Sequence, residues 1–147
     1  WFGEENVKDE YTCKVQKEAE KVRNKIIFTG FVNPDKMPLM YQIADCLVVP
    51  SIWEEPFGVV ALEGMASGLP LIVTNSGGLP EIVNDKCAVI VNKEKDIVNN
   101  LTDEMNKMMI NEAKAKKMGE CARETVQSNL EYDSRNYFGL FLKKTIG

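Results

Sequence analysis

The sequence contains no histidine among its 147 residues. This absence excludes Ser-His-Asp and Cys-His catalytic arrangements, HExxH metal sites and an imidazole general base within the chain. The four cysteines stand far apart and form neither a CxxC pair nor a metal-ligand spacing, which favours free thiols in a reducing cytoplasm. No apolar run approaches the roughly 20 residues that a membrane-spanning helix needs.

Basic residues are also too few for a protein dedicated to nucleic acid. Lys and Arg number 18 against 22 Asp and Glu, so the net charge is −4, whereas nucleic-acid-binding domains are usually basic. The lysines gathered at residues 114–117 and 143–144 are interpreted as solvated helix faces. With 44% hydrophobic and 27% charged residues, the composition predicts one domain over residues 1–147 with a sizeable core.

Short apolar runs predict a parallel sheet. Residues 46–49 and 71–73 are continuous runs of the kind buried on both faces, and residues 88–91 form a third run. The β-branched and aromatic run 26–29 predicts a further strand that ends at Gly30. Because helical patterns separate these runs, we predict an α/β fold with a Rossmann-like parallel sheet, helices on both faces and a helical C-terminus.

Helical periodicity fills most of the remaining chain. The predicted helices cover residues 9–23, 58–67, 94–110, 112–127 and 132–145, with a short turn at 80–83. Gly68 is expected to close the helix at 58–67. Asn33 can cap another helix that starts at Pro34. We expect the buried face of that helix to consist of Leu39, Met40, Ile43 and Ala44.

The segment from Glu55 to Glu63 combines a Pro-aromatic-Gly loop with an apolar helix that contains a carboxylate. A loop that opens a helix at the carboxyl end of a parallel strand is where α/β proteins bind ligands. The N–H groups of Gly58, Val59 and Val60 lack helical partners and lie at the positive end of the helix dipole. This helix start can therefore hold a phosphate.

The two carboxylates suggest what flanks that phosphate. Glu63 lies within the helix, where an ionised group is costly to bury unless hydrogen bonds satisfy it, and two vicinal sugar hydroxyls would do so bidentately. Glu55 lies before the helix, and the loop 75–78 follows the next strand at the same edge of the sheet. This arrangement suits a sugar–diphosphate–ribose ligand. Trp53 is either a packing residue under the loop or a platform for a sugar.

Over these residues the sequence resembles the C-terminal domain of retaining glycosyltransferases of the GT-B fold, group 1 (glycosyltransferase family 4). The family pattern has two glutamates separated by seven residues, with Pro-Phe-Gly after the first, as in residues 55–63. The resemblance runs over essentially the whole chain and is densest from 45 to 83. Its further segments are residues 28–32, 44–51, 64–70 and 75–83.

The resemblance implies roles for the residues of the helix start. Glu55 should hydrogen-bond the hydroxyls of the donor sugar and act at the catalytic centre, while backbone amides near Phe57 and Gly58 hold the sugar. The amides of Val59 and Val60 should meet the diphosphate. Glu63 should bind the ribose.

The resemblance also implies a donor and a reaction. Gly30, Phe31 and Val32 should flank the nucleobase of a UDP-, GDP- or ADP-sugar, mainly through their backbone. The reaction in this family retains the anomeric configuration and uses no metal or other cofactor. We expect transfer of a hexose to a glycan or a lipid-linked acceptor, as in polysaccharide biosynthesis.

Part of the family's machinery has no counterpart in this sequence. The Arg–Lys pair for the diphosphate and the N-terminal domain are both missing, and the chain opens on Trp1 rather than Met. We therefore expect residues 1–147 to be a single donor-binding domain, N-terminally truncated, from a larger two-domain enzyme. The isolated chain is expected to be inactive, and its apolar last helix to pack on the missing N-terminal GT-B domain.

Two alternatives stay open. One is the domain of a sucrose-, trehalose-phosphate- or glycogen-type synthase, and the other is a non-catalytic module that binds a nucleotide sugar or scaffolds partners. The presence of both Glu55 and Glu63 argues against the second. The expected location is cytoplasmic, and peripheral contact of the full-length protein with the inner face of the membrane is left open.

Overall fold

The computed structural model describes residues 10–22 and 25–128. These residues fall into two units, which divide between Met37 and Pro38. The helix predicted at residues 132–145 lies outside the described residues.

The first unit holds the helix α1 (Glu10–Glu20) and the 3-10 helix η1 (Pro34–Lys36). Asn33 caps η1 as predicted, because its side chain accepts a hydrogen bond from the N–H of Asp35 at 3.0 Å. The strand predicted at residues 26–29 is wrong. A strand needs a neighbour for its N–H and C=O groups, and the described residues of this unit contain no strand that could pair with it.

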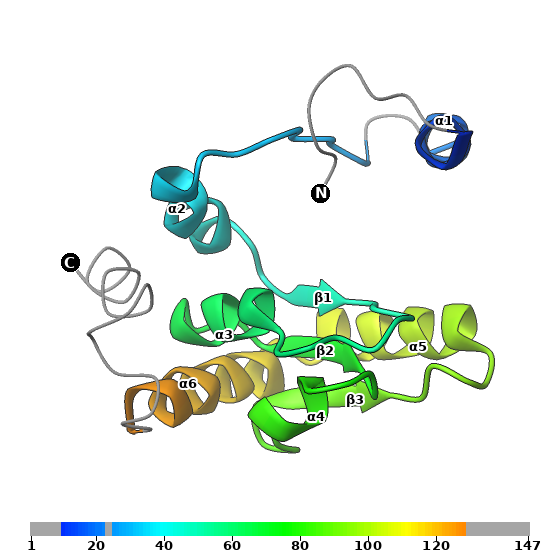
Figure 1. The fold of residues 1–147 in the computed structure, drawn as a ribbon. Coiled ribbons are helices and arrows are strands. Elements are labelled where there is room, and N and C mark those ends of the chain that lie inside the picture. The colour runs from blue at the N-terminus through cyan, green and yellow to red at the C-terminus, as the bar shows by residue number, and fades with distance from the viewer. Residues whose placement is uncertain (1–9, 23–24, 129–147) are drawn as a thin grey trace. The chain divides into compact units, whose positions relative to one another are not determined.

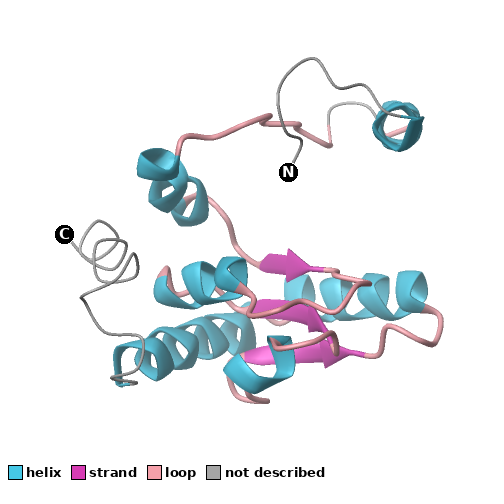
Figure 2. Ribbon diagram, in the orientation of Figure 1, coloured by secondary structure: helices cyan, strands magenta, loops and turns pink. Residues whose placement is uncertain are grey.

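The second unit is built on three parallel strands in the order β1 (Leu47–Val49), β2 (Leu71–Thr74) and β3 (Ala88–Val91). Figures 1 and 2 show them side by side, pointing the same way. All three coincide with the apolar runs of the sequence. The centre of the sheet is β2, which is buried throughout, whereas β1 is only half-buried. The prediction of full burial is thus right for β2 and wrong for β1, which pairs on one side only within the described residues.

Helices cover both faces of this sheet, as predicted. On one face, Ile72 packs in a cluster with Met108 of α5 (Ile97–Ile110) and Met118 of α6 (Glu112–Ser128). On the other face, Leu47 lies against Gly64 of α3 (Val59–Ala66). The two faces follow from the alternation of side chains along each strand. The turn expected after β2 is the short helix α4 (Leu79–Ile82).

The helix α3 ends as the sequence predicts. The N–H of Gly68 donates to the carbonyl of Met65 at 2.9 Å, and the N–H of Leu69 donates to that of Gly64 at 3.0 Å. This pair of hydrogen bonds satisfies carbonyls that the last turn of a helix leaves free. Apart from its first two residues, α3 is buried along its whole length, so its position is fixed by the core.

The short helix α2 (Met37–Gln42) does not present the face expected from the sequence. Its buried residues are Pro38 and Tyr41, whereas Leu39 and Ile43 are exposed. Met40 and Ala44, also expected on that face, are half-buried. A helix of six residues makes fewer than two turns, so its apolar positions define no stripe. Tyr41 of this helix makes a buried polar contact, described below.

The cysteines are free thiols in the described residues. Cys87 is buried and Cys46 packs against the core cluster, which confirms the expectation that both act as small core residues. Burial, with the charge of Asp45 adding to it, raises the pKa of Cys46 to about 11. Separately, none of the described helices combines the length and apolarity required to cross a membrane.

Candidate functional site

The loops that follow β1 and β2 lie against each other at the carboxyl edge of the sheet. The N–H of Gly78 donates to the carbonyl of Glu55 at 2.7 Å. A Cβ atom placed on Gly77 would lie 2.1 Å from that same carbonyl oxygen. Only glycine at this position allows the two loops to approach so closely. The structure thus brings together residues 51–58 and 75–78, as the sequence analysis expected.

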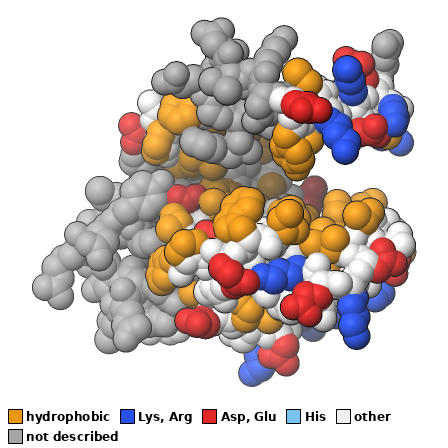
Figure 3. Space-filling view, turned by 45° about the vertical axis from the view of Figure 1, so that its right-hand side comes forward, with side chains coloured by type: hydrophobic (Ala, Val, Ile, Leu, Met, Phe, Trp, Pro, Cys, Tyr) orange, Lys and Arg blue, Asp and Glu red, His pale blue; other side chains and the backbone are white. Residues whose placement is uncertain are grey.

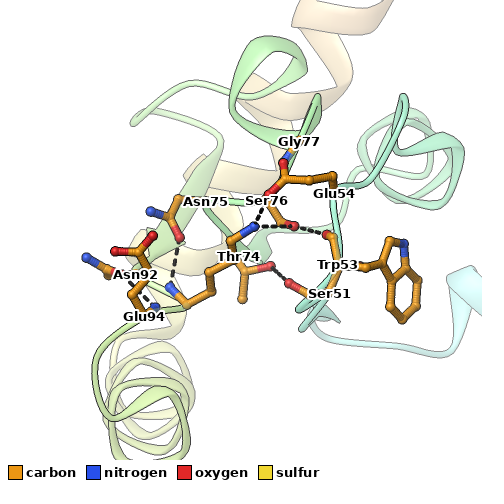
Figure 4. Close-up of polar contacts among 10 residues, drawn as sticks. Ser51, Trp53, Glu54, Thr74, Asn75, Ser76, Gly77, Asn92 and Glu94 are labelled. Atoms are coloured by element: carbon orange, nitrogen blue, oxygen red, sulfur yellow. Dashed lines mark hydrogen bonds and ion pairs between the residues drawn. The ribbon is translucent and has the colours of Figure 1, made fainter.

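Two buried hydroxyls continue this contact along the loops, as Figure 4 shows. Thr74 donates to the carbonyl of Ser51 at 2.6 Å, and Ser76 donates to the carbonyl of Trp53. Together with the N–H of Gly78, these donors hold alternate carbonyls of the loop that precedes α3. The backbone that carries Glu55 is therefore fixed at three successive points.

Lys93, just after β3, makes polar contacts with these two loops at the same edge of the sheet. Its ammonium lies 2.5 Å from Oε1 of Glu54 and donates to the hydroxyl of Ser76 at 3.3 Å. The other carboxylate oxygen of Glu54 accepts from the N–H of Gly77 at 2.9 Å. The hydrogen bond and charge of Lys93, helped by this N–H, hold the pKa of Glu54 below its usual value. The sequence analysis missed this contact.

The start of α3 presents free N–H groups. Gly58 precedes the helix with φ of 81°, and its carbonyl accepts from the N–H groups of Ala61 and Leu62 at 2.9 and 3.2 Å. Among the described residues, no acceptor meets the N–H groups of Val59 and Val60. No side chain caps the helix either. An anion can therefore bind here, at the positive end of the helix dipole.

The two predicted carboxylates differ in their surroundings. Glu55 is half-buried, and Oε2 of its carboxylate accepts from the hydroxyl of Ser51 at 3.3 Å. Glu63 is only 5% exposed, and its Oε2 accepts from the phenol of Tyr41 at 2.8 Å. Glu63 is thus no solvent-facing residue of the helix. Tyr41 is a further residue of this site that the sequence analysis missed.

Several apolar side chains around the helix start are exposed. The exposed fraction of Trp53 is 64%, and Figure 4 shows its indole pointing away from the loop contacts, so the packing interpretation is wrong. Phe57, Val59 and Val60 are also exposed. Figure 3 shows hydrophobic side chains among charged ones on the surface of this unit. Apolar surface at a ligand site is typical, because few polar groups are needed to orient a ligand.

The remaining predicted residues belong to the first unit. Gly30 has φ of 62°, Phe31 is exposed and Val32 is half-buried. Their role beside a nucleobase stays a prediction. Within residues 10–22 and 25–128, no three Cys, Asp or Glu side chains gather in a way that could hold a metal ion.

A pocket of about 330 Å³ lies elsewhere in the second unit, between β3 and the helices α5 and α6. The residues that line it include Val89, Met108, Met118, Lys107 and Lys114. It contains none of the residues predicted to bind a ligand.

Residues 2–125 match the profile of the family described as glycosyl transferases group 1. The chain belongs to the group 1 glycosyltransferases. An uncharacterized glycosyltransferase of Methanocaldococcus jannaschii is 53% identical over 62 residues, which are 42% of this chain and 16% of that protein.

Solved structures show the same fold for this group 1 glycosyltransferase. Sucrose-phosphate synthase from Thermosynechococcus elongatus is 30% identical with a TM-score of 0.73, over 82% of this chain and 30% of that one. The Anabaena protein HepE, in complex with UDP-glucose, is 20% identical with a TM-score of 0.73, over 99% of this chain and 37% of that one. The α/β fold predicted from the sequence is confirmed. The chain spans well under half the length of each of these proteins.

Proposed function

We propose that this chain binds the nucleotide-sugar donor of a retaining glycosyltransferase that moves a hexose to a glycan or lipid-linked acceptor. The observation that carries the proposal is the start of α3. It combines free N–H groups, a nearly buried carboxylate inside the helix and a second carboxylate on a loop held at three points. Such a site offers acceptors for hydroxyls on both sides of a place for a diphosphate.

Each group has one role in the proposal. The N–H groups of Val59 and Val60 bind the diphosphate, and the backbone near Phe57 and Gly58 holds the sugar. Glu55, beside them, accepts hydroxyls of the donor sugar at the catalytic centre. Because the backbone of its loop is already fixed, less conformational entropy is lost when Glu55 binds the sugar.

The remaining roles complete the proposal. Glu63 binds the ribose, and Gly30, Phe31 and Val32 flank the base of a UDP-, GDP- or ADP-sugar. The reaction needs no metal. The proposal places the enzyme in the cytoplasm, where free thiols such as those of Cys46 and Cys87 are expected.

The test is a calorimetric titration with UDP, GDP and ADP of the protein and of the variant Glu63→Ala. Loss of hydrogen bonds between a carboxylate and ribose hydroxyls should weaken binding by about 1.5–3 kcal/mol, which is roughly tenfold or more. Glu81→Ala serves as the matched control, because it removes an exposed carboxylate from the neighbouring helix α4. The tightest of the three nucleotides identifies the base.

Equal affinities of the wild type and Glu63→Ala for every nucleotide would refute the ribose role. A loss of the same size in Glu81→Ala would show that the effect is one of net charge rather than of a hydrogen bond.

A second candidate function is that of a synthase of a storage or stress sugar. The likeness to sucrose-phosphate synthase, at 30% identity, favours it. Such an enzyme would use the same donor site, so the two candidates differ in the acceptor. Product analysis of the longer protein with sugar phosphates, set against glycan and lipid-linked acceptors, separates them.

A further inference from the structure

The hydrogen bond between Tyr41 and Glu63 is a buried polar contact that links two helices of the second unit. The donor is the phenol of Tyr41 on α2, and the acceptor is Oε2 of Glu63 on α3, at 2.8 Å. Both residues are buried, with Glu63 only 5% exposed. A buried carboxylate needs such donors, because it has lost most of the hydrogen bonds that water gives it.

The second oxygen of this carboxylate has a different environment. No described residue donates a hydrogen bond to Oε1 of Glu63. Yet the described part of the chain holds no fully buried side-chain oxygen without a partner. Both statements hold only if Oε1 is still reached from the surface. A nearly buried carboxylate therefore keeps one oxygen free and accessible.

We propose that Tyr41 is a positioning residue that turns Glu63 toward a nucleotide ribose. It occupies Oε2 and so fixes the plane of the carboxylate, which leaves Oε1 as the oxygen that accepts the ribose hydroxyls. This inference rests on the proposed function, since it assumes a nucleoside diphosphate at the start of α3. It also changes the expected contact: vicinal hydroxyls meet one oxygen of Glu63 rather than both.

The physical advantage of Tyr41 is pre-organisation. A free glutamate side chain loses rotamer freedom when it binds a ligand, and that loss weakens the binding. Here the aromatic ring of Tyr41 is itself buried, so its hydroxyl is held in place. Glu63 thus meets the ligand already oriented, in the way that supporting residues fix the groups that touch a ligand.

The experiment measures how strongly the protein prefers an intact ribose. The probes are the nucleoside diphosphate that binds tightest in the titration above and its 2′,3′-dideoxy form. The ratio of their two dissociation constants is expected to be about tenfold or more in the wild type, as a charge-assisted hydrogen bond implies. In Tyr41→Phe the ratio should fall to about threefold or less.

Two variants control for effects on the fold. Ser67→Ala removes a different hydrogen bond of the same helix, from the hydroxyl of Ser67 to the backbone carbonyl of Glu63 at 2.8 Å. Tyr11→Phe removes the hydroxyl of an exposed tyrosine in α1. Both should keep the wild-type ratio. Partial unfolding weakens both affinities by the same factor, so the ratio remains a valid reading even if Tyr41→Phe is destabilised.

The outcomes separate this inference from the proposed function. A wild-type ratio near one would overturn the ribose role of Glu63 itself, and with it the role of Tyr41. A large wild-type ratio that persists in Tyr41→Phe would overturn the positioning role alone. A ratio that falls equally in Ser67→Ala would also overturn it, because general loosening of α3 would then explain the loss.

Discussion

Glu54 and Glu63 both accept hydrogen bonds close to the proposed donor site, but in opposite surroundings. Glu54 is exposed and accepts hydrogen bonds from the ammonium of Lys93 and from a backbone N–H. Glu63 is nearly buried and receives one neutral phenol. Water and salt screen the exposed pair, whereas little water can replace a hydrogen bond lost by the nearly buried group. We therefore infer that the neutral contact of Glu63 contributes more free energy of folding than the charged contact of Glu54.

The largest loss of stability is expected from Gly77→Ala, which disturbs the close approach of the two loops beside Glu54 rather than its ion pair. In Gly77→Ala, the added methyl group would lie 2.1 Å from the carbonyl oxygen of Glu55 and 2.5 Å from its nitrogen, at a φ of 51°. Neither neighbour is a flexible side chain, so the loops must separate. We expect the free energy of unfolding to fall by about 3 kcal/mol or more, measured by urea denaturation.

Gly30→Ala is the matched control for this variant. Its φ is also positive, at 62°, but an added methyl group would have nothing within 4 Å. Only the backbone conformation is disfavoured there, which costs about 1–2 kcal/mol. Equal losses in the two variants would show that the close approach of the two loops does not contribute to the free energy of unfolding.

The free energy of unfolding of Tyr41→Phe tests the buried hydrogen bond of Glu63. The substitution leaves Oε2 of Glu63 without its donor in a place that water barely reaches. We expect a loss of about 1–3 kcal/mol in the free energy of unfolding. Tyr11→Phe, at an exposed position, should change it by less than about 0.5 kcal/mol. If the buried variant lost no more than the exposed one, the contrast between the two glutamates would disappear.

The smallest effect is expected from Lys93→Met, which keeps the apolar stem of the side chain but removes its charge. Folding lowers the pKa of Glu54, so the contribution of this pair is complete above the usual glutamate pKa of about 4.3 and is lost as the pH falls below it. The stability difference between Lys93→Met and the wild type should therefore shrink on acidification, and also in high salt. Urea denaturation at pH 7 and pH 3.5 measures it.

Lys95→Met provides the reference, because Lys95 makes no ion pair with the described residues. A difference for Lys93→Met that stayed constant between the two pH values would exclude the ion pair as its cause.

The sequence was sufficient for the elements whose signal is local. The apolar run at β3 coincides with the strand Ala88–Val91, and the glycines at 58 and 68 bracket α3 as expected. The meeting of the loops 51–58 and 75–78 followed from a general property of parallel sheets, whose carboxyl ends share one edge. These predictions needed no knowledge of side-chain contacts.

The contacts that the sequence did not reveal join residues far apart in the chain. Tyr41 lies on a helix too short to define a face, and its partner Glu63 follows 22 positions later. Glu54 and Lys93 are 39 positions apart. Charged residues are frequent in this sequence, so no pattern marks which of them will pair. Residues 26–29 show the opposite failure: their composition predicts a strand, but the structure has none there, because β propensity alone does not make a strand.

Trp53, in the loop before α3, is suited to fluorescence spectroscopy of the proposed site. The carbonyl of Trp53 accepts a hydrogen bond from Ser76, while its indole is exposed to solvent. The sequence contains only one other tryptophan, Trp1. Replacing Trp1 with Phe therefore leaves Trp53 as the single tryptophan, on the loop that precedes the proposed site, and its emission can be excited apart from that of the four tyrosines. A change in its emission wavelength or in its quenching on addition of a nucleotide would show that the ligand alters the surroundings of this side chain, without any attached dye.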